Sequence, residues 1–380
     1  MAIDNKDKKV LNVPHLRFPE FSGEWVTKSI NDLAVVIGGG TPDTTVKSYW
    51  DGEIQWFTPS EIGKNKYVDS SLRTITEVGL NNSSAKLLPP NTILLSSRAT
   101  IGECSLSLRE CATNQGFQCL VSKKCNVDFL YYLIQTKKKD LIRKSCGSTF
   151  LEISANEVRK IQVSVPSDVE QQKIAELLSL IDERIATQNK IIDKLQSLIK
   201  GIRNDVFGKL RKDIGLNAKV GDVLSYEQPQ PYIVEDTEYT AGGTPVLTAN
   251  KAFVLGYTSE TDGIYDKGDC IIFDDFTLDC KYVDFPFKVK SSAIKILTAK
   301  NKELLRYTFE FLKYLDLSTD EHKRHYIAET QNQEFILPTT QIVRTMAHAF
   351  STLSSRMQTI VKQRDMLELQ KQYLLRQMFI

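Results

Sequence analysis

Hydrophobic residues recur at alternating intervals of four and three along two long stretches of the chain, one ending at Val206 and the other at Met378. This spacing places the apolar positions on one face of an α-helix, as in a coiled coil. The pattern therefore predicts two long helices. The first series is Ile174, Leu178, Ile181, Ile185, Gln188, Ile192, Leu195, Ile199, Ile202 and Val206, and the second is Met346, Phe350, Leu353, Met357, Ile360, Arg364, Leu367, Lys371, Leu374 and Met378.

The two stretches are diverged copies of each other. Residues 166–207 and 338–379 align without a gap at a constant offset of 172 positions, and nine of the 42 aligned positions are identical. Each copy follows a long variable stretch, so we expect a duplicated half and a pseudo-two-fold molecule. The identical pairs are Pro166/Pro338, Ala175/Ala347, Ser179/Ser351, Arg184/Arg356, Thr187/Thr359, Lys190/Lys362, Asp193/Asp365, Leu195/Leu367 and Phe207/Phe379.

Polar residues interrupt the two helical faces at different places. Arg364 and Lys371 of the second copy align with the apolar Ile192 and Ile199, whereas the first copy has its own polar intrusion at Gln188. A polar residue on such a face costs stability but fixes register and partner choice. We expect the helices to pair antiparallel; the alternative is that each only covers its neighbouring domain. The predicted pairing residues are Ile181, Ile185, Gln188, Ile192, Leu195, Leu353, Met357, Ile360, Arg364 and Leu367.

Capping residues mark where both helices begin. Pro166-Ser167-Asp168 and Pro338-Thr339-Thr340 each combine a proline with side chains that accept hydrogen bonds from the first helical N–H groups. About 40 residues at about 1.5 Å each make a rod of roughly 60 Å. Such a rod could separate two globular domains by one to two turns of duplex DNA, at about 34 Å a turn. Residues 208–218 are predicted to link the two halves.

The variable stretches, residues 1–165 and 219–337, predict mixed α/β domains. Strands are expected at 93–96 and 117–121, and a helix from Asn126 to about Lys144; the second stretch repeats this order at 270–273, 293–297 and 302–316. A glycine turn, an apolar strand and a Thr-led polar cluster also recur, at 50–60 and 240–250. The predicted fold class is α+β: two mixed α/β domains separated by two long antiparallel helices, at 166–207 and 338–380.

Composition describes a globular protein with an uneven charge distribution. Of its 380 residues, 41% are hydrophobic and 25% charged, and no apolar run is long enough for a membrane span, so a cytoplasmic location without membrane contact is expected. Seven cysteines without a C-x-x-C pair indicate neither a zinc site nor a disulfide framework. Residues 1–165 and 338–380 each carry +4, residues 166–207 carry −1 and residues 208–337 carry −5. If the acidic segment binds DNA, its charges must lie on separate faces.

Catalytic motifs are missing from the sequence. There is no H-E-x-x-H, Walker A, G-x-G-x-x-G or G-x-S-x-G pattern, and no Asn-Pro-Pro-Tyr or Asp-Pro-Pro-Tyr of the kind found in adenine methyltransferases. Gly38-Gly39-Gly40-Thr41-Pro42 lacks the lysine of a phosphate loop and is predicted to be a turn. Glu321-His322-Lys323 matches half of a nuclease motif, which leaves a metal-dependent nuclease as the weakest alternative. No bound metal or cofactor is expected.

Polar clusters in the predicted loops are the candidate DNA contacts. Arg, Lys, Asn, Gln, Ser and Thr carry donors and acceptors that match phosphates and base edges. A solvated helix face is the alternative for the lysine run that begins at Lys137. The candidates are Thr58, Ser60, Lys64, Arg98, Thr100, Asn114, Gln115, Lys137, Lys138, Thr248, Asn250, Lys251, His322, Lys323, Arg324, His325 and Tyr326.

The order of variable segment, long helix, variable segment, long helix resembles the specificity subunit of type I restriction-modification systems. The most specific similarity is Pro166-Ser167-Asp168-Val169-Glu170-Gln171-Gln172-Lys173-Ile174, which looks like the family's proline, Glu-Gln and Ile signature. His15-Leu16-Arg17-Phe18-Pro19, with Phe21 and Trp25, is similar to the family's entry into its first target recognition domain. The second copy departs from the signature, because residues 338–346 contain no Glu-Gln.

The resemblance implies a non-catalytic subunit. Each variable segment would be a target recognition domain for one half of a bipartite double-stranded DNA site, and the helices would set the spacing and hold two adenine methyltransferase subunits. ATP-dependent restriction subunits would join the complex, and S-adenosylmethionine, Mg²⁺ and ATP would be cofactors of these partners. The main alternative is a coiled-coil scaffold that binds only protein, which the acidic charge of residues 208–337 leaves open.

Overall fold

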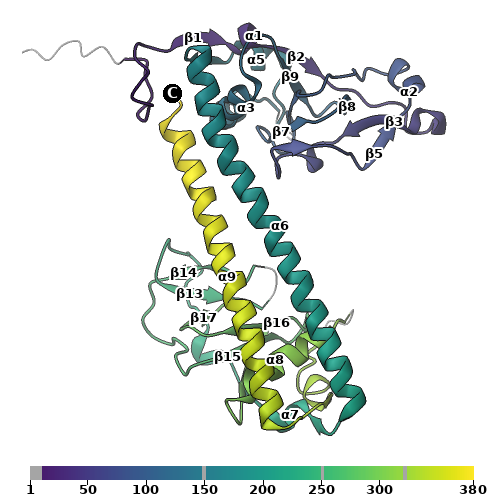
Figure 1. Cartoon of the computed structure of the whole chain (residues 1–380), viewed down its shortest axis with the longest axis vertical. Helices are drawn as coiled ribbons and strands as arrows, with labels where there is room; N and C mark the ends of the chain where they lie inside the picture. The colour runs from purple at the N-terminus through teal and green to yellow at the C-terminus, as the bar shows by residue number, and fades with distance from the viewer. Residues whose placement is uncertain (1–10, 148–150, 250–251, 320–322) are drawn as a thin grey trace, which may run out of the picture. The chain divides into compact units, whose positions relative to one another are not determined.

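The computed structural model describes residues 11–147, 151–249, 252–319 and 323–380. The chain divides into two compact units, of which the first consists of Met1–Asn189 with Lys362–Ile380 and the second of Lys190–Val361. Two long helices, α6 (Asp168–Asp213) and α9 (Thr340–Gln377), each contribute one part to either unit (Figure 1). Each unit is therefore a mixed α/β segment with a portion of both long helices.

Helix α6 begins where its caps predict and continues beyond its predicted end. Its first turn is acidic and its last turn is basic, which suits the helix dipole at both ends. Residues 208–213 are helical, so the linker predicted at 208–218 is too long. The sequence around Leu210 favours helix and its side chain is buried in the second unit's core. The chain turns only at Gly215, whose φ of +79° is the conformation that glycine tolerates.

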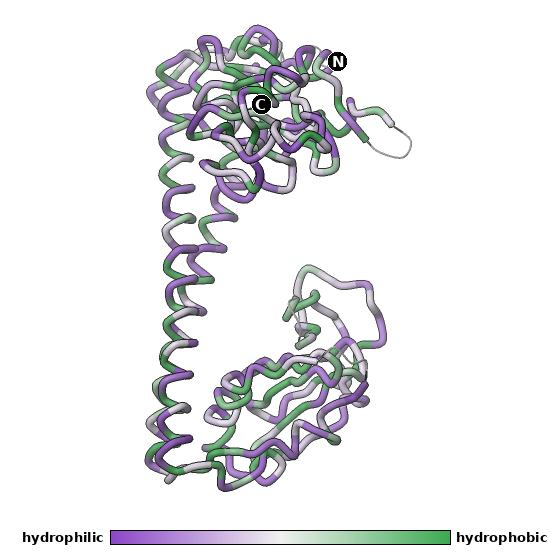
Figure 2. The backbone as a smooth tube through the Cα atoms, turned by 90° about the vertical axis from the view of Figure 1, so that its right-hand side faces the viewer, coloured by the Kyte–Doolittle hydropathy of each residue, from purple (hydrophilic) through white to green (hydrophobic). Residues whose placement is uncertain are grey.

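The two long helices pair antiparallel within each unit. In the first unit the early part of α6, including Ile174, Leu178 and Ile181, shares a core with Leu374 and Met378 near the end of α9. In the second unit the late part of α6 shares a core with the early part of α9. Apolar residues recur along both helices instead of forming a continuous run (Figure 2). The antiparallel arrangement in the predicted fold class is confirmed.

Every predicted pairing residue lies on the covered face of its helix, because none of the ten is exposed. Ile181, Ile185 and Leu367 pack against the first core, and Leu353 and Met357 against the second. The remaining five are buried or half-buried without belonging to either cluster. The ten residues of the heptad pattern are thus buried or half-buried along its full length, including the polar members, and their pairing stays a prediction.

The first unit contains two sheets and a short two-stranded ribbon. Its elements are β1 (Val26–Ser29), α1 (Ile30–Leu33), β2 (Ala34–Gly38), β3 (Trp50–Phe57), β4 (Tyr67–Val68), β5 (Arg73–Ile75), α2 (Glu77–Asn81), β6 (Ile93–Leu95), β7 (Cys104–Ser107), β8 (Cys111–Thr113), β9 (Gln118–Ser122), α3 (Val127–Thr136), α4 (Lys138–Arg143), α5 (Ala155–Lys160) and β10 (Gln162–Val165). The larger sheet has the order β2-β9-β6-β7-β4, the smaller has β5-β3-β8, and β1 pairs with β10.

The second unit repeats this topology, with four described strands in its larger sheet instead of five. Its elements are β11 (Ala218–Lys219), α7 (Val220–Val223), β12 (Leu224–Glu227), β13 (Thr244–Leu247), β14 (Val254–Thr258), β15 (Cys270–Asp274), β16 (Cys280–Val283), β17 (Lys288–Val289), β18 (Ile294–Ala299), α8 (Leu304–Leu315) and β19 (Glu334–Phe335). The sheets have the orders β12-β18-β15-β16 and β14-β13-β17, and β11 pairs with β19. In both units the small sheet joins one antiparallel and one parallel pair.

The predicted strands and helices fall on these elements. The recurring glycine–strand pattern corresponds to β3 and β13, which hold the same place in their sheets. Asn126 caps α3 by accepting a hydrogen bond from the N–H of Phe129, but the predicted helix divides at Lys137 into α3 and α4. In the part of the chain that the structure describes, no helix is long and apolar enough to cross a membrane. The pseudo-two-fold repeat thus extends from the helices to both segments.

Candidate nucleic-acid interface

Four loops of the first unit meet where strands β2, β3, β6 and β8 end. The loop after β8 joins the other three: Thr113 accepts from the N–H of Gly40, and Asn114 donates its N–H to Phe57, at 2.8 and 3.1 Å. The N–H of Ser97, after β6, donates to the carbonyl of Gly116 at 2.8 Å. These loops come from distant parts of the sequence, and strand order brings them together.

Glycines allow the loops to approach this closely. A Cβ on Gly39 would lie 2.0 Å from the carbonyl oxygen of Asn114, and one on Gly116 would lie 2.9 Å from Pro59. Real Cβ atoms essentially never come within 3.0 Å of another heavy atom. The backbone at Gly39 and Gly116 is therefore packed directly against the neighbouring loops, which fixes the positions of the side chains that the loops carry.

Four of the predicted DNA contacts lie in the turns directly after β3 and β8. Thr58 caps the turn after β3 by bonding to Glu61, and Ser60 beside it is exposed. Asn114 accepts from the N–H of Gly116 within its own turn, at 2.8 Å. Gln115 is exposed and accepts a hydrogen bond from the Thr41 hydroxyl. Ser60 and Gln115 therefore present polar groups outward, while Thr58 and Asn114 hold the backbone.

Arg98 and Thr100 line a neighbouring groove of about 760 Å³. Arg98 forms an ion pair with Glu152 at 2.9 Å, and Lys138 on the same groove pairs with Glu103. Ala99, between Arg98 and Thr100, has a φ of +53°, a left-handed conformation that is uncommon for a residue with a Cβ. The groove therefore holds two cations that are already neutralised by carboxylates.

The predicted lysine contacts are tied down to different degrees. Lys137 donates to the carbonyl of Ile380 at 2.6 Å, and burial lowers the pKa of this lysine. Lys138 is engaged by Glu103, as described above. Lys64 is exposed. Of these three, Lys64 most resembles a solvent-facing cation, whereas Lys137 takes part in the packing of the first unit.

In the second unit the basic cluster divides into a surface part and a core part. Lys323 and Arg324 are exposed, and Lys323 pairs with Glu329 at 2.9 Å. His325 and Tyr326 are each only 1% exposed. Tyr326 packs in the core, and His325 lies beside Glu329. The structure thus uses the last two residues of the cluster for packing, which the pattern of an irregular segment could not reveal.

Of the other candidates in the second segment, Thr248 lies in the part of the chain that the structure describes. Thr248 is buried, and its N–H donates to the carbonyl of Phe253 at 3.0 Å. Asn250, Lys251 and His322 lie outside the described residues. The strand β13 expected from the glycine–strand pattern is present, and the one described candidate after it is buried.

The loops after β6 and β15 are equivalent in backbone geometry. The N–H of Asp275 donates to Ala293 at 2.8 Å, as Ser97 donates to Gly116 in the first unit. The carbonyls of Ser97 and Asp275 accept from Ile153 and His325, at 3.1 and 3.0 Å. Asp275 adds a side-chain role, because its Oδ1 accepts from the N–H groups of His325 and Tyr326.

Strand register extends this equivalence to a second pair of residues. Leu120 pairs with Ile93 in the first unit, as Leu297 pairs with Ile271 in the second. Two residues before each leucine stand Gln118 and Lys295, which therefore hold the same place. The second unit has an ion pair between Lys295 and Asp275, where the first unit has uncharged side chains.

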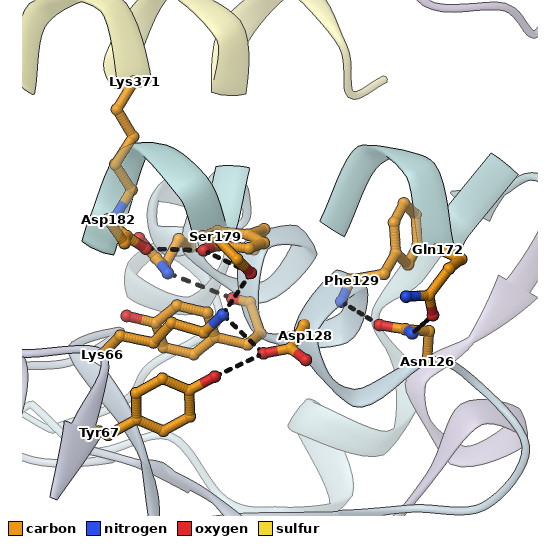
Figure 3. Close-up of polar contacts among 12 residues, drawn as sticks. Lys66, Tyr67, Asn126, Asp128, Phe129, Gln172, Ser179, Asp182 and Lys371 are labelled. Carbon is orange, nitrogen blue, oxygen red and sulfur yellow. Dashed lines mark hydrogen bonds and ion pairs between the residues drawn. The ribbon is translucent and has the colours of Figure 1, made fainter. Parts of the chain in front are cut away.

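A buried polar network, missed by sequence reasoning, joins the first segment to its helices (Figure 3). Lys66 is 5% exposed; its Nζ lies 2.6 Å from Asp128 Oδ1 and donates to Ser179 Oγ on α6 at 2.6 Å. The Tyr132 hydroxyl of α3 donates to Asp182 of α6 at 2.7 Å. Burial and the nearby Asp128 raise the pKa of Tyr67 to about 12. No local pattern marks Lys66, since its partners lie on α3 and α6.

The Glu-Gln pair at the start of α6 has a structural role. Glu170 is 1% exposed and accepts from Arg17 at 2.7 Å and from the indole of Trp25 at 3.3 Å. Gln171 accepts from the N–H of Asn126, the cap of α3. The pair therefore fastens the N-terminal segment and α3 to α6.

The second copy replaces these polar contacts with apolar packing. Ile342 and Val343 stand at the positions of Glu170 and Gln171, and Val343 is buried in the second core. The second copy thus lacks Glu-Gln because apolar residues pack its helix against the second unit's core. Among the described residues, no group of three or more His, Cys, Asp and Glu side chains could hold a metal ion.

Comparison with known proteins points to one family. Residues 22–197 match the type I restriction modification DNA specificity domain. The MjaIX specificity subunit of Methanocaldococcus jannaschii is 39% identical over 180 residues, which is 45% of this chain and 42% of that protein. The EcoR124I/EcoR124II specificity subunit of Escherichia coli is 45% identical over 126 residues, or 31% of each chain. The aligned parts thus span less than half of these curated relatives.

Solved structures resemble the chain over almost its whole length. The S subunit of a type I restriction-modification system from M. genitalium aligns with a TM-score of 0.62 and 16% identity, covering 97% of this chain and 99% of that one. A chain from a structure of type I R-M complex assembly aligns with a TM-score of 0.52, 12% identity and coverage of 92% and 96%. Residues 22–197 are therefore similar to the type I restriction modification DNA specificity domain, and the chain shares the fold of the S-subunit structures.

Proposed function

We propose that the chain is the DNA-recognition subunit of a type I restriction-modification complex, and that each mixed α/β segment recognises one half of a bipartite site. The observation that carries this proposal is the repeated topology with unequal loops. The strand ends are equivalent in both units, but the loop after β6 carries Arg98 and Thr100 where the loop after β15 carries Phe276 and Leu278. One scaffold with two different loop sets suits two different half-sites.

Exposed polar side chains on these loops are the proposed DNA contacts. In the first unit they are Ser60, Thr100 and Gln115, and in the second Lys323 and Arg324. Amide and hydroxyl groups match base edges, and lysine and arginine match phosphates or guanine. Arg98 would have to exchange Glu152 for a phosphate, which makes binding by the first unit sensitive to salt. Among the remaining described candidates, Thr58 and Asn114 are proposed to shape the loops.

Two methyltransferase subunits are the proposed partners of α6 and α9. Of the nine identical pairs in the repeat, five are buried or half-buried in both copies, and packing explains them. The other four are exposed in both copies: Arg184/Arg356, Thr187/Thr359, Lys190/Lys362 and Asp193/Asp365. Identity that persists on two exposed surfaces suits two copies of one partner, bound in the same way.

Charge reversal tests this docking surface one copy at a time. Arg184→Glu/Lys190→Glu on α6, or Arg356→Glu/Lys362→Glu on α9, should each reduce the bound methyltransferases from two to one, measured by native mass spectrometry. Combining all four should abolish binding. Lys194→Glu is the matched control, because Lys194 is exposed on α6 but aligns with Met366. Equal loss in the control and in the variants would contradict the proposed surface.

The helices are proposed to set the gap between half-sites. Restriction subunits would join the same complex, and S-adenosylmethionine, Mg²⁺ and ATP would be bound by the partners in the cytoplasm. Deleting residues 194–197 from α6 together with 366–369 from α9 removes about 6 Å of helix from both copies in register and spares the four exposed identical pairs. The gap in the methylated motif should then shorten by roughly one to two base pairs, given about 34 Å for each turn of DNA.

Mapping methylated adenines in the genome tests the function as a whole. A split motif with a constant gap, present only when the intact gene is present, is the expected result. A continuous motif, or a methylation pattern unaffected by loss of the gene, would contradict the proposal. A protein-only scaffold predicts that neither gene loss nor helix shortening affects any DNA modification.

A further inference from the structure

Asp182 on α6 and Lys371 on α9 form an ion pair across the helix seam of the first unit. We propose that this pair selects α9 of the same chain, instead of a helix from a second copy of the chain, as the partner of α6. The partner that the ion pair excludes is a helix from a second copy of the chain. This role does not depend on the proposed DNA recognition.

The ion pair is largely buried, and both carboxylate oxygens of Asp182 have a partner (Figure 3). Lys371 Nζ lies 2.7 Å from Asp182 Oδ1, and the two side chains are 15% and 14% exposed. The second oxygen, Oδ2, accepts from the Tyr132 hydroxyl at 2.7 Å. The ammonium also lies 5.5 Å from the centre of the Tyr132 ring. Removing either charge would leave the other partly buried without its counterion, which is unfavourable.

The repeat shows what stands at this place in the second unit. An offset of 172 carries Asp182 to Ser354 and Lys371 to Ile199. Ile199 is buried in an apolar core, and Ser354 accepts a hydrogen bond from Arg306. The second unit therefore closes the equivalent place of its seam without an ion pair between α6 and α9.

Homotypic helix pairs would leave the charges unmatched. In an antiparallel pair of two α6 helices with the same register, each Asp182 would meet an Ile199. In a pair of two α9 helices, each Lys371 would meet a Ser354. Both mismatches occur twice because such a pair is two-fold symmetric. Only α6 with α9 brings a carboxylate to an ammonium.

The other residues of the helix seam do not distinguish α9 of the same chain from a helix of a second copy. Leu195 and Leu367 are identical across the repeat, and Ile181 corresponds to Leu353, so apolar contacts are similar for every pairing. Arg364 is neutralised by its own helix, through Asp365. Lys66 cannot replace Lys371 at Asp182 without giving up the bonds to Asp128 and Ser179 described above. Two halves with one topology and similar seams are prone to exchange between copies, and a polar key at one position counteracts that.

The variant Asp182→Ser/Lys371→Ile of the 380-residue chain removes the Asp182–Lys371 ion pair, which is called the key below. It installs the uncharged combination that the second unit already packs, so the fold should persist. Wild type and variant are unfolded in urea, refolded over a range of concentrations and analysed by size-exclusion chromatography with light scattering. We expect the dimer fraction of the variant to be at least fivefold above that of the wild type. Mixing chains of two masses should then give hybrid dimers.

A second variant, Ile199→Lys/Ser354→Asp, duplicates the key instead of removing it. In a pair of two α6 helices Asp182 would now meet the introduced lysine, and in a pair of two α9 helices Lys371 would meet the introduced aspartate. The closed chain gains the same ion pair in its second unit and keeps the one in its first. Dimers should again increase, because the homotypic pairs no longer leave a charge unmatched.

An exposed ion pair outside the seam supplies the control. Glu303→Ser/Arg344→Ile removes a pair that involves α9 but does not face α6. Its dimer fraction should equal that of the wild type. A dimer fraction equal to that of the wild type in either refolded key variant, or an equal rise in the control, overturns the inference.

Discussion

Asp275 and Lys295 lie 3.6 Å apart in the second unit, and both side chains are 1% exposed. The same places in the first unit hold Ser97 and Gln118, whose Oγ and Oε1 atoms are buried and have no hydrogen-bond partner among the described residues. The same two positions thus hold an ion pair in the second unit and, in the first, two uncharged side chains with unsatisfied polar atoms. The two segments have diverged in their cores as well as in their loops.

Removing the cation from this pair should destabilise the second unit strongly. We expect Lys295→Met to lower the free energy of unfolding by about 3–5 kcal/mol, because Asp275 would keep a buried charge without its counterion. Asp275→Asn/Lys295→Met should cost less, since asparagine still accepts the N–H bonds of His325 and Tyr326 without a charge. Urea denaturation followed by circular dichroism measures both. A double variant less stable than the single one would contradict this account.

Lys66 should matter for the first unit in a comparable way. Lys66→Met removes an ion pair whose carboxylate, Asp128, is about one third exposed, so we expect a loss of about 2 kcal/mol. The three tryptophans, Trp25, Trp50 and Trp56, all belong to the first unit, so their fluorescence reports its unfolding selectively. Lys64→Met is the matched control, because Lys64 is exposed two residues away. Equal effects of both substitutions would show that the Lys66 network contributes nothing.

Buried thiols should make the first unit sensitive to alkali. Burial raises the pKa of Cys119 from 9.0 to about 12. The folded state therefore keeps its proton while the unfolded thiol ionises, so the stabilisation present below pH 9 is lost as the pH rises toward 12. For one such thiol the loss is about 1.4 kcal/mol for each pH unit above 9. Urea unfolding followed by tryptophan fluorescence at pH 8 and pH 10 measures this loss. Cys119→Ala should make the free energy of unfolding less dependent on pH, by the contribution of one proton. An unchanged slope would exclude Cys119 as a contributor.

The long helices could be predicted because their determinants are local. Seam residues such as Leu178 and Leu374 recur at fixed spacing, and the caps stand beside them in the sequence. The predicted end of α6 lies too early because Gly208 resembles a stop signal, although Leu210 beyond it is buried in the core. Local patterns do not include such tertiary contacts.

The candidate site could be predicted only as a set of loops. Thr58 and Asn114 lie 56 positions apart, and it is sheet order that brings the loop after β3 to the loop after β8. His325 and Tyr326 look like part of a basic surface, yet hydrogen bonds to Asp275 draw their backbone inward. The burial of Lys66 likewise depends on partners on α3 and α6.

Gly39 should be essential for the loop cluster but not for the rest of the chain. In Gly39→Ala the new methyl group would collide with the carbonyl of Asn114 and force the loops after β2 and β8 apart. We expect at least a tenfold loss of affinity for the cognate DNA, measured by fluorescence anisotropy, with hydrogen exchange raised only in residues 38–41 and 113–117. Gly208→Ala is the matched control: its methyl group would meet nothing within 4 Å on α6, and it should stabilise the helix by about 0.5–1 kcal/mol. Normal DNA affinity in a folded Gly39→Ala protein would place the recognition surface elsewhere on the first unit.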